Sequence, residues 1–120
     1  MIDHIGLFVS DAAQYADFYE KLLAPLGYVN KVAYPTAVCF ANDEDGYSVW
    51  LESPKDGNPV VPSHVAFRAK DEAAVKAFHE AGLASGGTDN GAPGPRPNYG
   101  PTYYAAFIHD PDGKIGRAHV

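Results

Sequence analysis

Apolar and other residues alternate along residues 2–9, and this alternation predicts a β-strand with one buried face. The apolar face is formed by Ile5, Leu7 and Val9. The same alternation returns at residues 64–69, where the apolar face is formed by Val65, Phe67 and Ala69. His4 and His64 therefore lie on the other face of each strand, the one that is not purely apolar.

A helical pattern follows each of these strands. Asp11 is placed to cap the first helix, and Gln14, three residues later, completes a capping box. Asp71 is placed to cap the second helix. Buried stripes are predicted for Tyr15, Phe18, Tyr19, Leu22 and Leu23 in the first helix and for Val75, Phe78 and Leu83 in the second. Each helix is expected to cover the apolar face of its strand and to leave the histidine face open.

The chain contains one internal repeat. With a shift of sixty positions, residues 4–23 align without a gap on residues 64–83. Six identical pairs in twenty positions exceed the roughly one pair expected from average residue usage. The identical pairs are His4 with His64, Asp11 with Asp71, Ala13 with Ala73, Phe18 with Phe78, Glu20 with Glu80, and Leu23 with Leu83.

Three further strands are expected after each helix. In the first copy they are predicted at residues 28–34, 36–42 and 47–53. In the second copy, residues 86–101 hold five glycines and four prolines and predict a long loop, followed by strands at 102–109 and 114–120. The fold class is therefore α+β, with two tandem βαβββ modules in one domain. Module 1 spans about residues 1–55 and module 2 about residues 62–120, joined by a linker at 54–62.

Composition narrows the function classes. A chain of 120 residues with 46% hydrophobic and 20% charged residues is typical of one globular domain. No apolar run is long enough for a membrane span, and the net charge of −6 with scattered basic residues argues against nucleic acid as a partner. Cys39 is the single cysteine, which fits a reducing compartment, and the N-terminal residues show no signal-peptide pattern. We therefore expect a cytoplasmic protein.

The order of several motifs resembles the vicinal oxygen chelate superfamily, which includes glyoxalases, bleomycin resistance proteins and extradiol dioxygenases. These motifs are Asp3-His4-Ile5-Gly6-Leu7, the capped helix with Phe18-Tyr19, the stretches 89–99 and 103–107, and Asp110-Pro111-Asp112-Gly113. The resemblance covers essentially the whole chain. It implies sheets that curl around a cleft for a small molecule, a divalent metal on the concave face, and a homodimer.

The resemblance also implies metal ligands. His4 and His64 match the two first-strand ligands, and Glu52 matches the last-strand carboxylate of the first module. Two imidazoles and one carboxylate suit Zn, Ni, Fe or Mn. The fourth family position is lost, because it falls on Gly116 or Arg117 and neither side chain can ligate a metal. His119 is a weaker candidate, since it lies near the end of the last strand.

A further set of residues is expected to contact the ligand. Trp50 and Phe8 share the open face with the histidines, and the glycine- and proline-rich segment contributes Arg96, Tyr99 and Tyr103. Arg96 could pair with an anionic group while the tyrosines stack or donate hydrogen bonds. The alternative interpretation is a rigid solvated loop.

Three function classes remain open. The leading one is metal-dependent lyase or isomerase chemistry of the lactoylglutathione lyase kind, on a substrate with vicinal oxygens. Glu52 would then be either a metal ligand or the catalytic base, and no second carboxylate is available for the other role. The second class is an extradiol dioxygenase, which needs two histidines and one carboxylate. The third is a protein that binds a flat or anionic small molecule without catalysis. The absence of a carboxylate at the fourth family position favours this third class.

Overall fold

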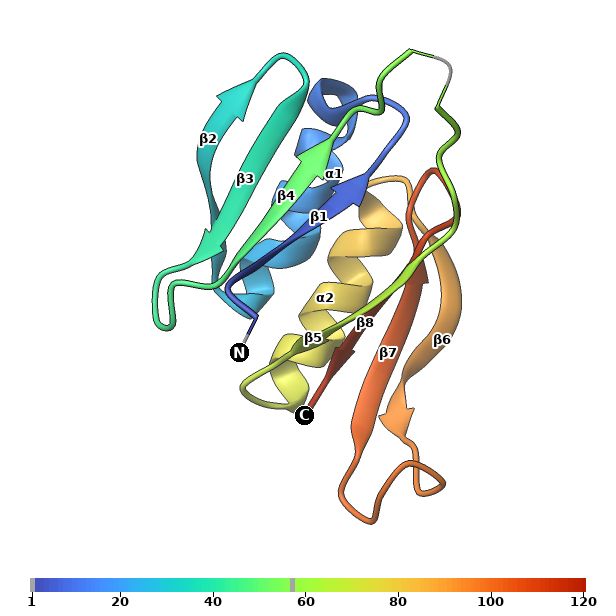
Figure 1. The fold of residues 1–120 in the computed structure, drawn as a ribbon. Helices are drawn as coiled ribbons and strands as arrows, with labels where there is room; N and C mark the ends of the chain where they lie inside the picture. The colour runs from blue at the N-terminus through green and yellow to red at the C-terminus, as the bar shows by residue number, and fades with distance from the viewer. Residues whose placement is uncertain (1, 57) are drawn as a thin grey trace.

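The computed structural model describes residues 2–56 and 58–120, and it confirms the two βαβββ modules (Figure 1). Module 1 contains β1 (His4–Phe8), α1 (Ala12–Leu23), the short 3-10 helix η1 (Ala24–Leu26), β2 (Tyr28–Tyr34), β3 (Ala37–Asn42) and β4 (Ser48–Glu52). Module 2 contains β5 (His64–Arg68), α2 (Glu72–Ala84), β6 (Thr88–Pro95), β7 (Tyr104–His109) and β8 (Ile115–His119).

The two sheets have the same topology. Their strand orders are β1-β4-β3-β2 and β5-β8-β7-β6. The first and last strands of each module pair in parallel, and the other neighbours pair antiparallel. β1 and β5 have the same pattern of burial, with His4 and His64 exposed at their starts and Leu7 and Phe67 buried. The predicted placement of both histidines away from the apolar face is confirmed.

Both helices begin at the predicted caps. The Asp11 carboxylate accepts from the Gln14 N–H, and the Asp71 carboxylate accepts from the Ala74 N–H. The buried stripe of α1 is close to the predicted one. In α2 the prediction was wrong at Leu83, which is 45% exposed. Gly82 takes the buried position instead, because the helical spacing from Val75 and Phe78 leads to residue 82.

Residues 88–95 were predicted as loop but form the strand β6. β6 lies at the edge of its sheet and pairs only with β7, with register shifts between Asp89 and Gly91 and between Gly91 and Gly94. An edge strand with bulges tolerates glycine and proline, since its outer side needs no ladder hydrogen bonds. The irregular part of the segment is therefore shorter than expected.

The modules contact each other through α1, α2 and η1, and through a polar cluster between α1 and the β7–β8 turn. The Tyr19 hydroxyl donates to the buried Asp110 carboxylate. The Ser10 N–H and hydroxyl both donate to Asp112, at 2.7 and 2.9 Å. These hydrogen bonds join the loop between β1 and α1 to the turn between β7 and β8. No helix in the described part of the chain is long and apolar enough to cross a membrane.

Candidate functional site on the open faces of the sheets

The open face of module 1 carries a carboxylate and an imidazole. A cavity of about 360 Å³ is lined by His4, Gly6, Trp50 and Glu52. The Glu52 carboxylate lies over Gly6, where a Cβ would come within 2.6 Å of Oε2. Glycine at position 6 therefore leaves room for the carboxylate. The His4 Nδ1 lies 2.9 Å from Asp3 Oδ1, which orients the ring.

Phe8 lies on the same face and is 50% exposed, directly opposite Glu52 in the β1–β4 register. The structure thus places four of the predicted residues of module 1, His4, Phe8, Trp50 and Glu52, on one face of one sheet.

The open face of module 2 has a different chemistry. Its cavity of about 360 Å³ is lined by His64, Asn90, Gly91, Arg96, Tyr99, Phe107, Ile115 and Arg117. No Asp or Glu is among these residues. The segment predicted to border the site does so through residues 90, 91, 96 and 99. A cavity with two guanidinium groups and no carboxylate favours an anionic occupant.

Arg117 is held between aromatic rings. Its guanidinium carbon lies 4.6 Å from the Phe107 ring centre and 5.3 Å from that of Tyr99. Its Nη1 donates to the Tyr103 hydroxyl at 3.0 Å. Its Nε is buried and has no hydrogen-bond partner in the described part of the chain. Arg117 is therefore fixed in orientation by stacking and by one hydrogen bond, and the donors of its Nη2 are left for a ligand.

Arg96, which was expected to pair with an anionic ligand group, is held by the backbone of its own segment. Its guanidinium donates to the carbonyl oxygens of Ala92, Gly94 and Pro95, at 2.8, 2.9 and 3.2 Å. It also lies 5.4 Å from the Phe107 ring centre. Arg96 therefore stabilises the irregular end of β6 through these hydrogen bonds. Because its guanidinium is held in place, it contributes positive charge to the cavity from a fixed position.

The register of β8 shows which residues match the carboxylate strand of module 1. Phe8 pairs with Glu52, and the corresponding pair in module 2 is Arg68 with His119. His119 is thus the counterpart of Glu52, and Arg117 is the counterpart of Trp50. Gly116 faces α2, since a Cβ there would approach the Phe78 ring. By this register, the counterpart of Glu52 within the chain is His119, and neither Gly116 nor Arg117 occupies that position.

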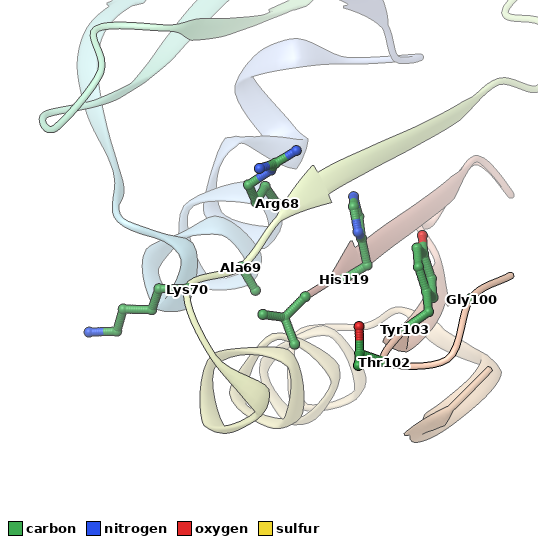
Figure 2. Close-up of a pocket in the computed structure, with 8 residues that line it drawn as sticks. Arg68, Ala69, Lys70, Gly100, Thr102, Tyr103 and His119 are labelled. Atoms are coloured by element: carbon green, nitrogen blue, oxygen red, sulfur yellow. The ribbon is translucent and has the colours of Figure 1, made fainter. Parts of the chain in front are cut away.

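His119 borders a second cavity of module 2, of about 550 Å³, together with Arg68, Thr102 and Tyr103 (Figure 2). The imidazole stacks on the Tyr103 ring, with centres 5.0 Å apart and an angle of 7° between planes. Figure 2 shows Arg68, His119 and Tyr103 projecting to the same side, while Lys70 extends away from them.

The two histidines that line the cavities of module 2, His64 and His119, are biased towards the neutral form. Burial lowers the pKa of His64, and the charge of Arg117 lowers it further. Burial likewise lowers the pKa of His119, with added contributions from Arg68 and Arg117. These shifts follow from the concentration of positive charge on this face, because a nearby cation disfavours the imidazolium.

The metal implied by the resemblance does not fit the donors of one chain. His4 and Glu52 share a cavity in module 1, but His64 lines the cavity of module 2 beside Arg117. Across residues 2–56 and 58–120, no three His, Cys, Asp or Glu side chains lie close enough together to hold a metal ion. A guanidinium beside His64 also repels a divalent cation.

Comparison with known proteins agrees with this architecture. The family model described as "Glyoxalase/Bleomycin resistance protein/Dioxygenase superfamily" matches residues 1–114. The chain belongs to this superfamily. A solved glyoxalase/bleomycin resistance protein from Albidiferax ferrireducens T118 is 29% identical, with a TM-score of 0.84, over 99% of this chain and 97% of that one.

Two more distant structures of this superfamily's fold support the fold alone. A glyoxalase-related enzyme from Fulvimarina pelagi is 20% identical, with a TM-score of 0.74, over 99% of this chain and 86% of that one. The protein ATC0852 from Agrobacterium tumefaciens is 24% identical, with a TM-score of 0.71, over 100% and 96% of the two chains. A search of curated proteins finds no match.

Two residues of the site, Arg68 and Phe107, were not singled out from the sequence. A signal for Arg68 was present, because Arg68 alternates with His64 and therefore shares its open face. His119 was considered from the sequence as a weaker metal ligand, since it lies as many residues after Gly113 as Glu52 lies after Gly46. Phe107 gave no such signal, because an aromatic residue in a strand is usually core.

Proposed function

We propose that this superfamily member binds a small anionic molecule with a flat portion on the open face of module 2. The observation that carries the proposal is Arg117, a stacked guanidinium with donors left over in a cavity that no carboxylate lines. Phe107 and Tyr99 offer ring surfaces for the flat portion of the ligand. We place this binding in the cytoplasm as part of the proposal, because a single cysteine requires no oxidising compartment.

Charge distribution supports the proposal. The chain carries 15 acidic and 9 basic residues, so a surface region without acids is unusual for it. In the described part of the chain, Arg68, Arg96 and Arg117 form no ion pair with a carboxylate. Three guanidinium groups without carboxylate partners make the electrostatic potential of this module locally positive. A bound anion would reduce the repulsion between them.

Benzoate is a suitable first probe, because it combines one carboxylate with one ring. Titration calorimetry of the parent chain should detect its binding, and Arg117→Gln should weaken the affinity about tenfold or more, equivalent to ~1.4 kcal/mol. Arg117→Lys keeps the charge but loses the planar fork, so it should fall between the two. Lys76→Gln removes one positive charge from the exposed side of α2 and is the matched control. Benzoate affinity that is undetectable, or that is insensitive to Arg117→Gln, would contradict the proposal.

The second candidate is metal-dependent lyase or isomerase chemistry, which is favoured by one observation: His4 and Glu52 share a cavity. His64 is the third ligand in this proposal, and a homodimer is one way for a second chain to supply it. A bound divalent metal would polarise vicinal oxygens of a substrate, with Glu52 as ligand or base. Metal analysis of protein purified without added metal tests this candidate, and His4→Ala should then abolish the bound Zn, Ni, Fe or Mn. Iron together with oxygen uptake would indicate the extradiol dioxygenase class instead.

A further inference from the structure

The outward-facing residues of β5 and β8 form a track, and members of this track line both cavities of module 2. The track has three rungs, which are His64 opposite Ile115, Ala66 opposite Arg117, and Arg68 opposite His119. Positive charge is present at two of these rungs, from Arg117 and Arg68. On the same rung as Arg117, β5 contributes only the exposed methyl group of Ala66. Arg117 and Arg68 therefore occupy diagonal positions of two adjacent rungs, and Ala66 and His119 occupy the other two positions.

The two guanidiniums open into different cavities. Arg117 lines the cavity that contains His64, and Arg68 lines the larger cavity that contains His119. The wall between the two cavities is aromatic, because Tyr103 stacks on His119 and its ring centre lies 5.4 Å from that of Tyr99. The Arg117–Tyr103 hydrogen bond belongs to the same wall. Neither cavity is lined by an Asp or Glu among the residues that the structure describes.

We propose that the ligand of this face carries two separated acidic groups, one bound by Arg117 and the other by Arg68, with its flat portion over Ala66. This inference rests on the proposed function and specifies its ligand class. The Cα atoms of the two arginines are separated by two residues along a strand, about 3.3 Å each, and by one strand across, about 4.8 Å, which gives roughly 8 Å. Flexible side chains can converge from that separation on the two acidic groups of a para-substituted ring.

Module 1 shows why the second cation is informative. The residues at the positions of Arg68 and His119 are Phe8 and Glu52, so the same backbone positions there carry a ring and a negative charge. The β5–β8 backbone therefore does not require a cation at position 68. Arg68 is exposed and forms no ion pair in the described residues, and it also lines a smaller cavity together with Asp3 and His4.

Three benzene carboxylates test the inference by titration calorimetry on the intact chain. Terephthalate holds two carboxylates at opposite ends of the ring, phthalate holds the same two charges side by side, and benzoate has one. Terephthalate should bind at least about tenfold more tightly than phthalate or benzoate. Arg68→Gln should remove this advantage and leave benzoate affinity within about twofold, whereas Arg117→Gln should weaken all three probes. Lys76→Gln serves as the charge control on the helical side.

The outcomes separate this inference from the function on which it rests. Arg117-dependent benzoate binding without a terephthalate advantage would overturn the two-acid ligand and leave the proposed function standing. No binding of any probe would overturn both. Equal loss for benzoate and terephthalate in Arg68→Gln would also overturn the inference, because it would indicate a general charge effect. The para-diphosphonate of benzene, compared with terephthalate, shows whether phosphonate or carboxylate groups suit the two positions better. Thermal melts confirm that each variant is folded.

Discussion

Replacing Tyr19 by Phe removes one hydroxyl from the contact between the two modules. Tyr19 is 4% exposed, and its hydroxyl donates to Asp110, which is 6% exposed. Burial raises the pKa of Tyr19 above its ordinary value, and the charge of Asp110 raises it further, so the hydroxyl remains a donor at all working pH values. The other Asp110 oxygen already accepts from the N–H groups of Asp112 and Lys114, at 2.9 and 2.8 Å.

The substitution therefore leaves one oxygen of a buried carboxylate without a donor. Hydrogen bonds to charged groups contribute about 1.5–3 kcal/mol, and a buried unsatisfied acceptor adds its own desolvation cost. We expect Tyr19→Phe to lower the free energy of unfolding by about 2–3 kcal/mol and the Tm by roughly 10 °C. The Phe18–Tyr19 ring contact is kept, so the loss belongs to the hydroxyl. Urea denaturation at pH 7, followed by circular dichroism, measures the change.

Tyr15→Phe is the matched control. The Tyr15 hydroxyl donates to Asp112 over 3.2 Å at a partly exposed position, so its removal should cost less than about 1 kcal/mol. Equal losses in the two variants, or a loss below about 0.5 kcal/mol for Tyr19→Phe, would refute the reasoning that burial of the carboxylate sets the magnitude.

Three other outcomes are expected. Gly82→Ala should destabilise the fold by about 1–2 kcal/mol, measured by urea denaturation, because the new Cβ would lie 3.0 Å from Ile108. This cost should exceed the gain in helix propensity. A stabilised variant would show that the neighbouring side chains move to accommodate the methyl group. Benzoate affinity should rise as the pH falls below about 6.5, since the lowered pKa values of His64 and His119 keep both side chains neutral above it and let them become cationic only in more acid solution. Calorimetry that finds no rise, or that finds the same rise after both residues are changed to Gln, would contradict this. The parent should bind Zn or Ni weakly, and Arg117→Glu should tighten this binding well over tenfold by calorimetry, because it replaces a repelling charge with a ligand. If a lysine-to-glutamate change at an exposed position of α2 gave the same gain, the effect would not be local to the cavity.

Local patterns were sufficient for most of the fold. Alternation identified β1 and β5, and capping residues located the starts of α1 and α2, because these signals depend on a few neighbouring residues. β6 could not be predicted in this way. Its glycines and prolines read as loop, and they are accepted in a strand only because β6 has a neighbour on one side and two register shifts. Edge position is a property of the sheet and leaves no local mark.

The site was predictable in part for the same reason. Alternation correctly placed His4 and His64 on open faces, since side-chain direction in a strand has a period of two. Whether the two histidines share one cavity depends on how the sheets meet, which no local pattern encodes. For the counterpart of Glu52 the sequence offered two answers: the family motif indicated Gly116 or Arg117, and spacing from the preceding turn indicated His119. The strand register agrees with the spacing.

The two modules show which parts of a duplicated unit are constrained. Facing the helices, both first strands keep large apolar residues, Leu7 and Phe67, because these positions must fill a close-packed core. Facing outwards, the counterparts Glu52 and His119 differ in charge, as do Phe8 and Arg68. Packing does not constrain an open face, so its chemistry can change without loss of the fold. Module 2 has cavities lined by arginine and by no carboxylate on the same backbone that carries an acid in module 1, and the proposed anionic ligand would account for this difference.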